Sequence, residues 1–341
     1  METHLNRLIL LGGSAGGFKA AVKVIANLEA NVPAAIILVL HLGPGPASGV
    51  AAQLTKIGLL PAALAVDGEP LEAGRIYIAP PDYHTLIREN TISLSRGPRV
   101  NQSRPAIDLT FRSAAVSYGT QAIGVILSGM LDDGATGLLA IKRCGGVTVC
   151  QDPADALYPD MPQSAIACVH PDHTLPALAI GNLLNRLTKT AVETKAPVPA
   201  DIMLENRFDL NNRDDLDQMD QLGRRVPVSC PECGGPLWEI KKNGVSHYRC
   251  HIGHSLTTHS LLMRQDEAIE STLWIALRTL EEKARMQEKL AQGEQASDRK
   301  MLVGSFRQRA AETRAHAERL RKLLLEIGEA SISIESGHDT E

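Results

Sequence analysis

Aromatic residues are scarce in this chain of 341 residues: four phenylalanines, five tyrosines and two tryptophans make up 3% of it. That is too few for the stacking platforms on which proteins bind single-stranded nucleic acids. An excess of basic charge is absent too. The net charge of −4 argues against a protein that holds nucleic acid by bulk electrostatics. We therefore expect no nucleic-acid partner.

Long hydrophobic runs are also missing. No stretch approaches the roughly 18 consecutive apolar residues of a membrane span. The apolar run at 8–11 is too short for the core of a secretion signal. We expect a cytoplasmic protein without membrane insertion. The six cysteines fit this view, because a chain of this length needs no disulfides, so its thiols should be free or bound to metal.

Residues 1–187 alternate between short apolar runs and amphipathic segments with helical spacing. Nearly continuous apolar strands between such helices are typical of a parallel sheet that is covered on both faces. The sequence therefore predicts an α/β fold with a doubly wound, mostly parallel (Rossmann-like) sheet. The clearest predicted strands are LILLG (8–12), AAIILVL (34–40), AIGVILSG (122–129) and VTVCQ (147–151).

The rest of the chain divides into four shorter parts. Residues 188–223 carry many Asn and Asp residues and no apolar period, so they are expected to form a linker. Residues 224–258 contain a cysteine and histidine cluster and predict a zinc-ribbon-like module. Residues 259–330 hold two long amphipathic patterns that predict a helical hairpin. Residues 331–341 are expected to form a flexible tail.

A glycine-rich turn, GGSAGGFK, follows the first predicted strand. It fits neither the dinucleotide fingerprint nor the P-loop, in which a lysine would stand where Phe18 is found. It does fit G-x-S-x-G, the pattern of a sharp turn that exposes a nucleophilic serine, here Ser14. The alternative is that Ser14 caps the next helix through its hydroxyl group.

A nucleophilic serine needs a base and a carboxylate that orients this base. In an open parallel sheet, active sites lie beyond the carboxyl ends of the strands. His41 directly follows one predicted strand, and Asp132 and Asp133 follow another. These side chains converge with Ser14 if the first strand lies between the other two. Each also has a purely structural explanation: His41 as the residue that ends a strand, and the aspartate as the N-cap of the helix that follows.

Three further histidines are weaker candidates for the base. His84 follows the third predicted strand and is a rival to His41. His170 and His173 lie near the end of the predicted α/β domain, and surface histidines of this kind mostly have no chemical role.

Six segments of residues 7–187 carry a resemblance to a known enzyme family. They make this part of the chain resemble the catalytic domain of the bacterial chemotaxis protein-glutamate methylesterases, the CheB type. The resemblance implies a doubly wound, largely parallel sheet. It also implies hydrolysis of glutamate methyl esters on chemoreceptor helices with release of methanol, and deamidation of receptor glutamines. The segments are LGGSAGG, LVLHLGPG, GRIYIAPPDYHTLI, RPAIDLTFRSAA, VILSGMLDDGATGL and QDPADALYPDMPQSAI.

Carried over position by position, the resemblance implies a catalytic triad of Ser14, His41 and Asp133. It also implies that the backbone N–H of Met130 stabilises the oxyanion, and that catalysis needs no cofactor. Well-known members of the family carry a phosphorylatable receiver domain ahead of the catalytic domain. Here the catalytic domain begins at the first residues. We therefore expect no control by phosphorylation in cis.

The cysteine and histidine cluster combines Cys230-x₂-Cys233 with Cys250-x₃-His254, sixteen residues apart. This spacing is close to that of paired zinc knuckles and predicts a structural zinc site with four protein ligands. His251 is an alternative fourth ligand, and chance clustering of reduced cysteines is the plainer explanation. A similar tail follows methylesterase-like domains in some relatives. The other cysteines, Cys144, Cys150 and Cys168, are expected to be free thiols in the α/β core.

Three hypotheses about function follow. The first is an esterase that acts on glutamate methyl esters, or on another ester, with the C-terminal part serving recruitment to a methylated helical signalling protein. The second is a non-catalytic signalling scaffold, against which the complete triad argues. The third is a zinc-ribbon nucleic-acid module on a small-molecule hydrolase, against which acidity and scarce aromatics argue. The helical hairpin is expected to bury its own apolar stripes, with dimerisation or docking on a helical partner as the alternative.

Overall fold

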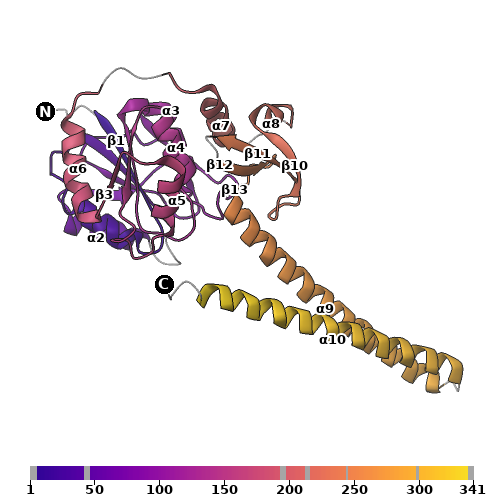
Figure 1. Ribbon diagram of the computed structural model, residues 1–341. Coiled ribbons are helices and arrows are strands. Elements are labelled where there is room, and N and C mark those ends of the chain that lie inside the picture. The colour runs from indigo at the N-terminus through magenta and orange to yellow at the C-terminus, as the bar shows by residue number, and fades with distance from the viewer. Residues whose placement is uncertain are drawn as a thin grey trace. The chain divides into compact units, whose positions relative to one another are not determined.

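The computed structural model describes residues 6–41, 47–192, 197–211, 216–242, 245–296 and 299–336. The chain divides into two compact units, Met1–Leu261 and Leu262–Glu341. The first unit holds the large sheet (Figure 1) and the cysteine cluster, and the second holds most of two long helices. No helix in the described ranges is long and apolar enough to cross a membrane.

A parallel sheet of seven strands forms the centre of the first unit, in the order β3-β4-β2-β1-β7-β8-β9. Its two longest strands, β1 and β2, are buried at every residue, as their continuous apolar sequences predict. The predicted parallel α/β fold is confirmed. The strands are β1 (Arg7–Gly13), β2 (Ala34–Leu40), β3 (Ala62–Leu64), β4 (Ile76–Ile78), β7 (Ala122–Ile126), β8 (Val147–Gln151) and β9 (His173–Leu175).

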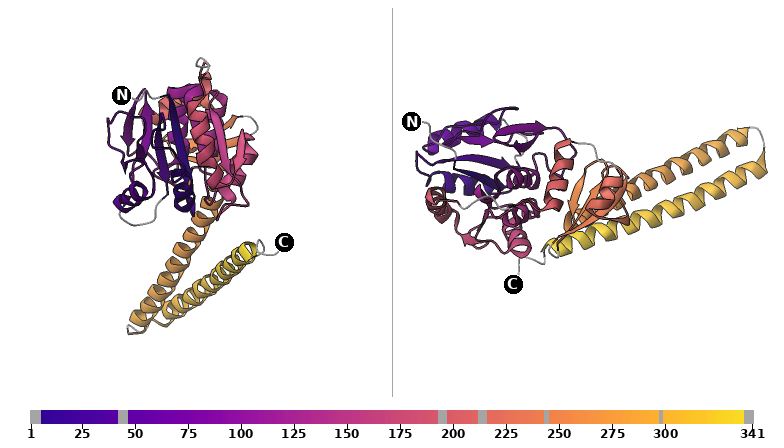
Figure 2. Two further views of the ribbon diagram at one scale, coloured as in Figure 1. Left: turned by 90° about the vertical axis from the view of Figure 1, so that its left-hand side faces the viewer. Right: turned by 90° about the horizontal axis from the view of Figure 1, so that it is seen from above.

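Helices cover both faces of this sheet, so it is doubly wound (Figures 1 and 2). One face packs against α1 (Gly17–Ile25), α2 (Ala47–Ile57) and α6 (Ala177–Lys189). The other face packs against α3 (Ile107–Tyr118), α4 (Ala135–Arg143) and α5 (Asp160–Val169). A one-turn 3₁₀ helix, Gly119–Gln121, joins α3 to β7, and an antiparallel hairpin of β5 (His84–Arg88) and β6 (Thr91–Ser95) lies beside α3.

The segment 188–223, which was expected to be a linker, contains α7 (Ala200–Asn211) and α8 (Leu216–Leu222). The helices were missed because α7 has no marked apolar face. It is held by the buried apolar side chains of Ile202 and Phe208 and also by charged side chains, since Glu205 and Asp209 are buried against Arg112 of α3. A periodicity of apolar residues cannot reveal a helix that packs through ion pairs.

A second, antiparallel sheet follows, in the order β10-β11-β12-β13. Its strands are β10 (Arg224–Ser229), β11 (Pro236–Lys242), β12 (Val245–Cys250) and β13 (Ser255–Thr257). The sequence Lys242-Asn243-Gly244 predicts a hairpin turn between β11 and β12, and its last two residues lie outside the described residues. Residues 224–257 with the cysteine cluster are called the ribbon module below.

Two long helices, α9 (Thr258–Ala296) and α10 (Lys300–Ser336), make up the C-terminal part. They pack on each other through an apolar seam, as the amphipathic pattern predicts for a helical hairpin. α10 extends to Ser336, so the first half of the segment expected to be a flexible tail is helical. The seam residues are Leu273, Leu277, Leu280, Ala317, Leu320 and Leu324.

Candidate active site

Ser14 directly follows β1, at the turn into α1. Its N–H donates to the C=O of Ser128 (3.0 Å), and its C=O accepts from the N–H of Gly17 (2.9 Å). Gly16 has a φ of 72°, and a Cβ at this position would lie 2.6 Å from Ser128 Oγ, so the bend requires glycine. Within the described residues no side chain caps α1, which leaves the Ser14 hydroxyl outside a capping role.

His41 directly follows β2, the strand beside β1. Its N–H donates to the C=O of Gly13 (3.1 Å), which continues the ladder between the two strands to their ends. Its Nε2 lies 3.0 Å from Oδ2 of Asp133, in the loop after β7. Because β1 lies between β2 and β7, the structure brings His41 and Asp133 together beside the strand that ends at Ser14.

The orientation of the His41 ring indicates which nitrogen can act as a base. An ionised carboxylate only accepts hydrogen bonds, so Nε2 donates its proton to Asp133, and in the neutral ring Nδ1 then carries the lone pair. Nδ1 lies 3.4 Å from the hydroxyl oxygen of Ser103. In the described part of the chain, the hydrogen bonds of the ring reach Asp133 and Ser103, and none reaches Ser14.

Asp133 is buried and surrounded by donors. Its Oδ1 accepts from Asn101 Nδ2 (3.0 Å) and from the Asp108 N–H (3.3 Å), and its Oδ2 accepts from the Ile107 N–H (2.7 Å). Burial alone raises the pKa of Asp133, but the hydrogen bonds from His41, Ile107 and Asn101 outweigh burial and hold this pKa below its usual range. The carboxylate is therefore ionised and fixed in direction.

The loop after β7 also passes close to Ser14. A Cβ on Gly129 would lie 3.0 Å from Ser14 Cβ and 2.0 Å from Met161 Sδ, so glycine is needed for this close approach. The N–H of the next residue, Met130, donates no hydrogen bond within the described ranges. An unpaired N–H beside a serine is what an oxyanion donor requires.

The neighbouring Asp132 points away from the imidazole. Its carboxylate accepts hydrogen bonds from the hydroxyl groups of Thr257 and Ser260, in and just after the ribbon module. Burial raises the pKa of Asp132, and these two hydroxyl groups lower it in part. Of the two adjacent aspartates, Asp133 is thus the one in contact with His41.

The other candidate histidines lie elsewhere. His84 is buried, and both of its ring nitrogens have partners: Nε2 the C=O of Pro98 (2.9 Å) and Nδ1 the N–H of Ala106 (3.2 Å). Burial lowers the pKa of His84. His170 and His173 lie at the amino end of β9, whereas Ser14 lies at the carboxyl ends of the parallel strands, on the opposite side of the sheet. These three histidines do not converge on the site.

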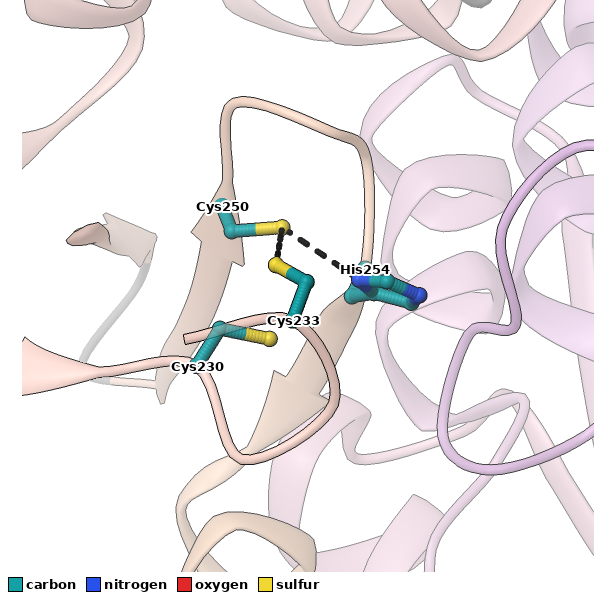
Figure 3. Close-up of side chains that lie close together, drawn as sticks. All are labelled: Cys230, Cys233, Cys250 and His254. Carbon is teal, nitrogen blue, oxygen red and sulfur yellow. Dashed lines mark hydrogen bonds between the residues drawn. The ribbon is translucent and has the colours of Figure 1, made fainter. Parts of the chain in front are cut away.

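The ribbon module brings its four predicted ligands together (Figure 3). The ligand atoms of Cys230, Cys233, Cys250 and His254 all lie within 4.8 Å of one another. Cys233 Sγ is 3.7 Å from Cys250 Sγ, and Cys250 Sγ is 3.5 Å from His254 Nδ1. Two thiolates at about 2.3 Å from a tetrahedral zinc would be separated by about 3.8 Å. The cluster can therefore accept a metal ion.

Two tight turns form this cluster. The N–H of Cys230 donates to the C=O of Gly235 (2.7 Å), and the N–H of Cys250 donates to the C=O of His254 (2.9 Å). His251, the alternative ligand, lies outside the cluster, with its Cε1 2.8 Å from where a Cβ on Gly235 would be. The remaining cysteines, Cys144, Cys150 and Cys168, are free thiols in the α/β part, as expected.

Comparison with known proteins decides the family. The sequence model described as CheB methylesterase matches residues 9–184, the part of the chain that forms the large sheet. The chain belongs to the CheB methylesterase family. The implied fold is confirmed, because the crystal structure of the Thermotoga maritima CheB methylesterase catalytic domain is similar. It is 34% identical, with a TM-score of 0.52, and the match covers 53% of this chain and 98% of that one.

Two curated relatives have names that agree with this family. A protein of Leptospira interrogans named putative protein-glutamate methylesterase/protein-glutamine glutaminase is 38% identical over 188 residues, which are 55% of this chain and 97% of the relative. The protein-glutamate methylesterase/protein-glutamine glutaminase of Symbiobacterium thermophilum is 34% identical over 181 residues. That match covers 53% of this chain and 50% of the relative.

Three residues that contact His41 or Asp133 were not singled out from the sequence: Asn101, Ser103 and Asp108. Asn101 is buried in a left-handed conformation (φ 46°), where asparagine is tolerated better than most residues. Asp108 lies in the first turn of α3, and its Oδ1 accepts the N–H of Gly137 (2.7 Å). Asn101 and Ser103 come from a segment without an unusual motif, whereas Asp108 lies in RPAIDLTFRSAA, a segment that carries the family resemblance but assigns Asp108 no role. Only the folded chain brings the three residues to Asp133 and His41.

Asp108 gives a pH-dependent prediction. Burial, and then the charge of Asp133, raise the pKa of Asp108 from 3.8 to about 7. Between these values the folded state binds more protons than the unfolded chain, so stability falls as the pH rises through this window. We expect the free energy of unfolding of the wild type to fall by on the order of 2 kcal/mol relative to Asp108→Asn, from about pH 5 to about pH 8.

Urea unfolding of both chains at these two pH values measures this difference. At a single pH, the difference in free energy of unfolding between the two chains includes the effect of the changed hydrogen bonds. The change of this difference between the two pH values reports the titration of Asp108. A difference that stays constant would mean that Asp108 does not titrate between pH 5 and pH 8.

Proposed function

We propose that this member of the CheB methylesterase family is a serine hydrolase that removes methyl groups from glutamate methyl esters of a chemoreceptor-like signalling protein. The observation that carries the proposal is the hydrogen bond of 3.0 Å between His41 and Asp133, at strand ends that flank Ser14. The names of the relatives supply the substrate class. The same site is proposed to deamidate glutamines, because the amide is attacked at the same carbonyl carbon.

In the proposed reaction, Ser14 Oγ attacks the ester carbonyl while Nδ1 of His41 takes its proton. Asp133 holds the ring in the tautomer that leaves Nδ1 free and stabilises the imidazolium that forms. The tetrahedral oxyanion is stabilised by the Met130 N–H, a contact that can contribute about 10²–10³ in rate. His41 then returns the proton to the departing methoxide, which leaves as methanol. A water molecule hydrolyses the acyl-enzyme by the same steps and restores Ser14.

The hydroxyl of Ser103, which lies near Nδ1, is proposed to be displaced when Ser14 engages the ring. Hydrogen bonds of catalytic groups are often long or misaligned before substrate binds. A hollow of about 250 Å³ beside His41 offers room for the substrate side chain. Arg99 and Arg104 are among its lining residues. Such a basic rim is complementary to the acidic, methylated helices of the proposed partner.

In the ribbon module, the proposed metal is a structural zinc held by Cys230, Cys233, Cys250 and His254. Four protein ligands leave no open coordination position for substrate, so this ion would take no part in the ester chemistry. The distances between sulfur and nitrogen atoms support this ligand set. We expect one zinc per chain, lost in a chain with both Cys230→Ser and Cys233→Ser.

The decisive experiment measures methanol release from a methylated chemoreceptor fragment by the wild type, Ser14→Ala and Ser103→Ala. We expect release by the wild type, a loss of about 10⁴-fold or more in Ser14→Ala, and at most a tenfold loss in Ser103→Ala. The two serines compete for one imidazole, so the pair is a matched control. A larger loss in Ser103→Ala than in Ser14→Ala would reverse the assignment of the nucleophile.

Measurements on the wild type also distinguish the two alternatives, a hydrolase for a different ester and a non-catalytic scaffold. A wild-type chain that releases no methanol in the presence of its natural partner, yet still reacts with a fluorophosphonate at Ser14, would be a hydrolase for a different ester. A chain that does neither would be a scaffold that keeps only the fold.

A further inference from the structure

The ribbon module contacts the backbone of Asn101, the residue whose side chain donates a hydrogen bond to Asp133. Asn101 donates through Nδ2 to Oδ1 of Asp133 (3.0 Å) and to Oδ2 of Asp108 (2.9 Å). Its own backbone N–H donates to the C=O of Ser255, the first residue of β13 (2.8 Å). Asn101 is 5% exposed and has a left-handed backbone. One buried residue therefore connects a strand of the ribbon module to the carboxylate that orients His41.

A second contact reaches the residue before Asp133. Thr257, at the end of β13, and Ser260, in the first turn of α9, both donate through their hydroxyl groups to Asp132. Asp132, in the loop that carries the candidate carboxylate, is thus held by one residue of β13 and one residue of α9. A displacement of β13 would move this loop as well as Asn101.

A third contact runs through buried ion pairs. Arg249 of β12 pairs with Asp209 of α7, which also pairs with Arg112 of α3. The first two N–H groups of α3, those of Ile107 and Asp108, donate to Asp133. The ribbon module therefore also holds the helix whose N-terminus binds the carboxylate.

The metal ligands lie where they would control β13. Cys250 is the last residue of β12, and His254 directly precedes β13. A metal ion between these two ligands fixes the turn that leads from one strand to the other. The apolar cluster around them is small, with Cys230, Leu237, Cys250, Leu256 and Leu261 as its buried members among the described residues. A metal ion on these four ligands would add to the order that this cluster and the buried Trp238 and Ile240 give the module.

We propose that Asn101 is a positioning residue for the hydrolase site and that, through Asn101, metal bound at the Cys230, Cys233, Cys250 and His254 cluster sets the turnover of this site. The inference rests on the proposed function. When the metal is lost, β13 no longer holds the Asn101 N–H, and the amide of Asn101 leaves Asp133. The imidazole of His41 then loses its fixed direction. The hollow beside His41 is lined by no residue of the ribbon module but by Gln102 and Ser103, which follow Asn101, so we expect KM to change far less than turnover.

The test compares three samples: the zinc-loaded full-length chain, the same chain after a chelator has removed the zinc, and the variant Cys233→Ser. Cys168→Ser is the control, because it removes a thiol outside the cluster. The rate of labelling of Ser14 by a fluorophosphonate, and kcat and KM for methanol release, are measured for each. We expect labelling and kcat to fall by about 10- to 100-fold on loss of zinc, with KM changed less than twofold. Cys168→Ser keeps the wild-type values, and added zinc restores the chelated chain.

Asn101→Ala tests the route of the coupling. With zinc bound, Asn101→Ala should show the same fall in labelling and kcat, and removal of zinc should lower its labelling less than twofold further. Such non-additivity is expected when two changes act through one contact. If removal of zinc slowed labelling of Asn101→Ala by the same factor as it slows labelling of the wild type, the role of Asn101 would be overturned. Unchanged labelling in the chelated wild type would overturn the whole inference.

A further variant keeps the test valid if the zinc-free chain unfolds, which circular dichroism reports. Thr257→Val removes the hydroxyl that donates to Asp132 but leaves the four metal ligands in place. With zinc bound and at unchanged KM, Asn101→Ala is then expected to label about 10- to 100-fold more slowly, and Thr257→Val less than tenfold more slowly because Ser260 still donates to Asp132. Normal labelling of both would overturn the inference. Labelling needs no natural substrate. Zinc-dependent labelling without methanol release would therefore count against the proposed substrate alone.

Discussion

Asp133→Asn is expected to lower kcat for methanol release by about 10⁴-fold with little change in KM. The amide of asparagine donates a hydrogen bond where the carboxylate accepts one, so His41 would turn its unprotonated Nε2 toward residue 133. The proton of the neutral ring would then lie on Nδ1, and no lone pair would face Ser14. Steady-state kinetics on the methylated receptor fragment measure the loss.

Asp132→Asn is the matched control, because it changes the adjacent carboxylate in the same way. Asp132 contacts Thr257 and Ser260 but not His41. Its amide oxygen can still accept one of the two hydroxyl groups, so we expect less than a tenfold loss of kcat. Equal losses in the two variants would contradict the assignment of Asp133 as the residue that orients the base.

The second large effect concerns stability. Asp209→Ala is expected to lower the free energy of unfolding by about 3–5 kcal/mol. Asp209 is buried and accepts hydrogen bonds from both Arg112 and Arg249. Its removal leaves two buried guanidinium groups without one of their carboxylate partners, and a buried charge that lacks a partner costs several kcal/mol.

Urea unfolding followed by the fluorescence of Trp238 measures this effect, in a background of Trp274→Phe that leaves one tryptophan. Trp238 is buried beside Phe208 and Met219, so it reports on the part of the chain that Asp209 connects. Glu29→Ala serves as the control, because it breaks the exposed ion pair with Lys189 and should cost less than about 1 kcal/mol. A loss as small as that of the control would mean that water replaces the carboxylate of Asp209.

The sequence predicted the fold of the α/β part because its strands and helices follow simple rules. β1 and β2 are apolar at nearly every position, which only a sheet buried on both faces explains. The strand-end candidates, Ser14, His41 and the pair Asp132 and Asp133, followed from the same rule, since the carboxyl ends of parallel strands meet at one edge. The choice of Asp133 over Asp132 came from the family resemblance. Their spacing along the chain carries no information on hydrogen bonds, so the use of Nε2 rather than Nδ1 toward Asp133 emerges only in the folded chain.

The contacts between distant segments were not predictable. Asn101 is 32 residues from Asp133 and 154 residues from Ser255, and no local pattern relates them. The same holds for α7, which is stabilised by buried ion pairs with partners in α3 and β12. Helix and strand propensities, and the periodicity of apolar residues, describe the conformation of one segment and which of its faces is apolar. They do not predict which charged side chains of distant segments will form ion pairs in the folded chain.

The ladder between β1 and β2 has a consequence for how the length of this chain can vary. Gly13 pairs with Leu40, and the His41 N–H extends the pairing by one more hydrogen bond. Successive side chains of a strand point to opposite faces, so inserting or deleting one residue within 34–40 would carry His41 to the wrong side of the sheet. Insertions and deletions that preserve activity are therefore confined to the connections between the strands, and this stretch of seven residues has a fixed length.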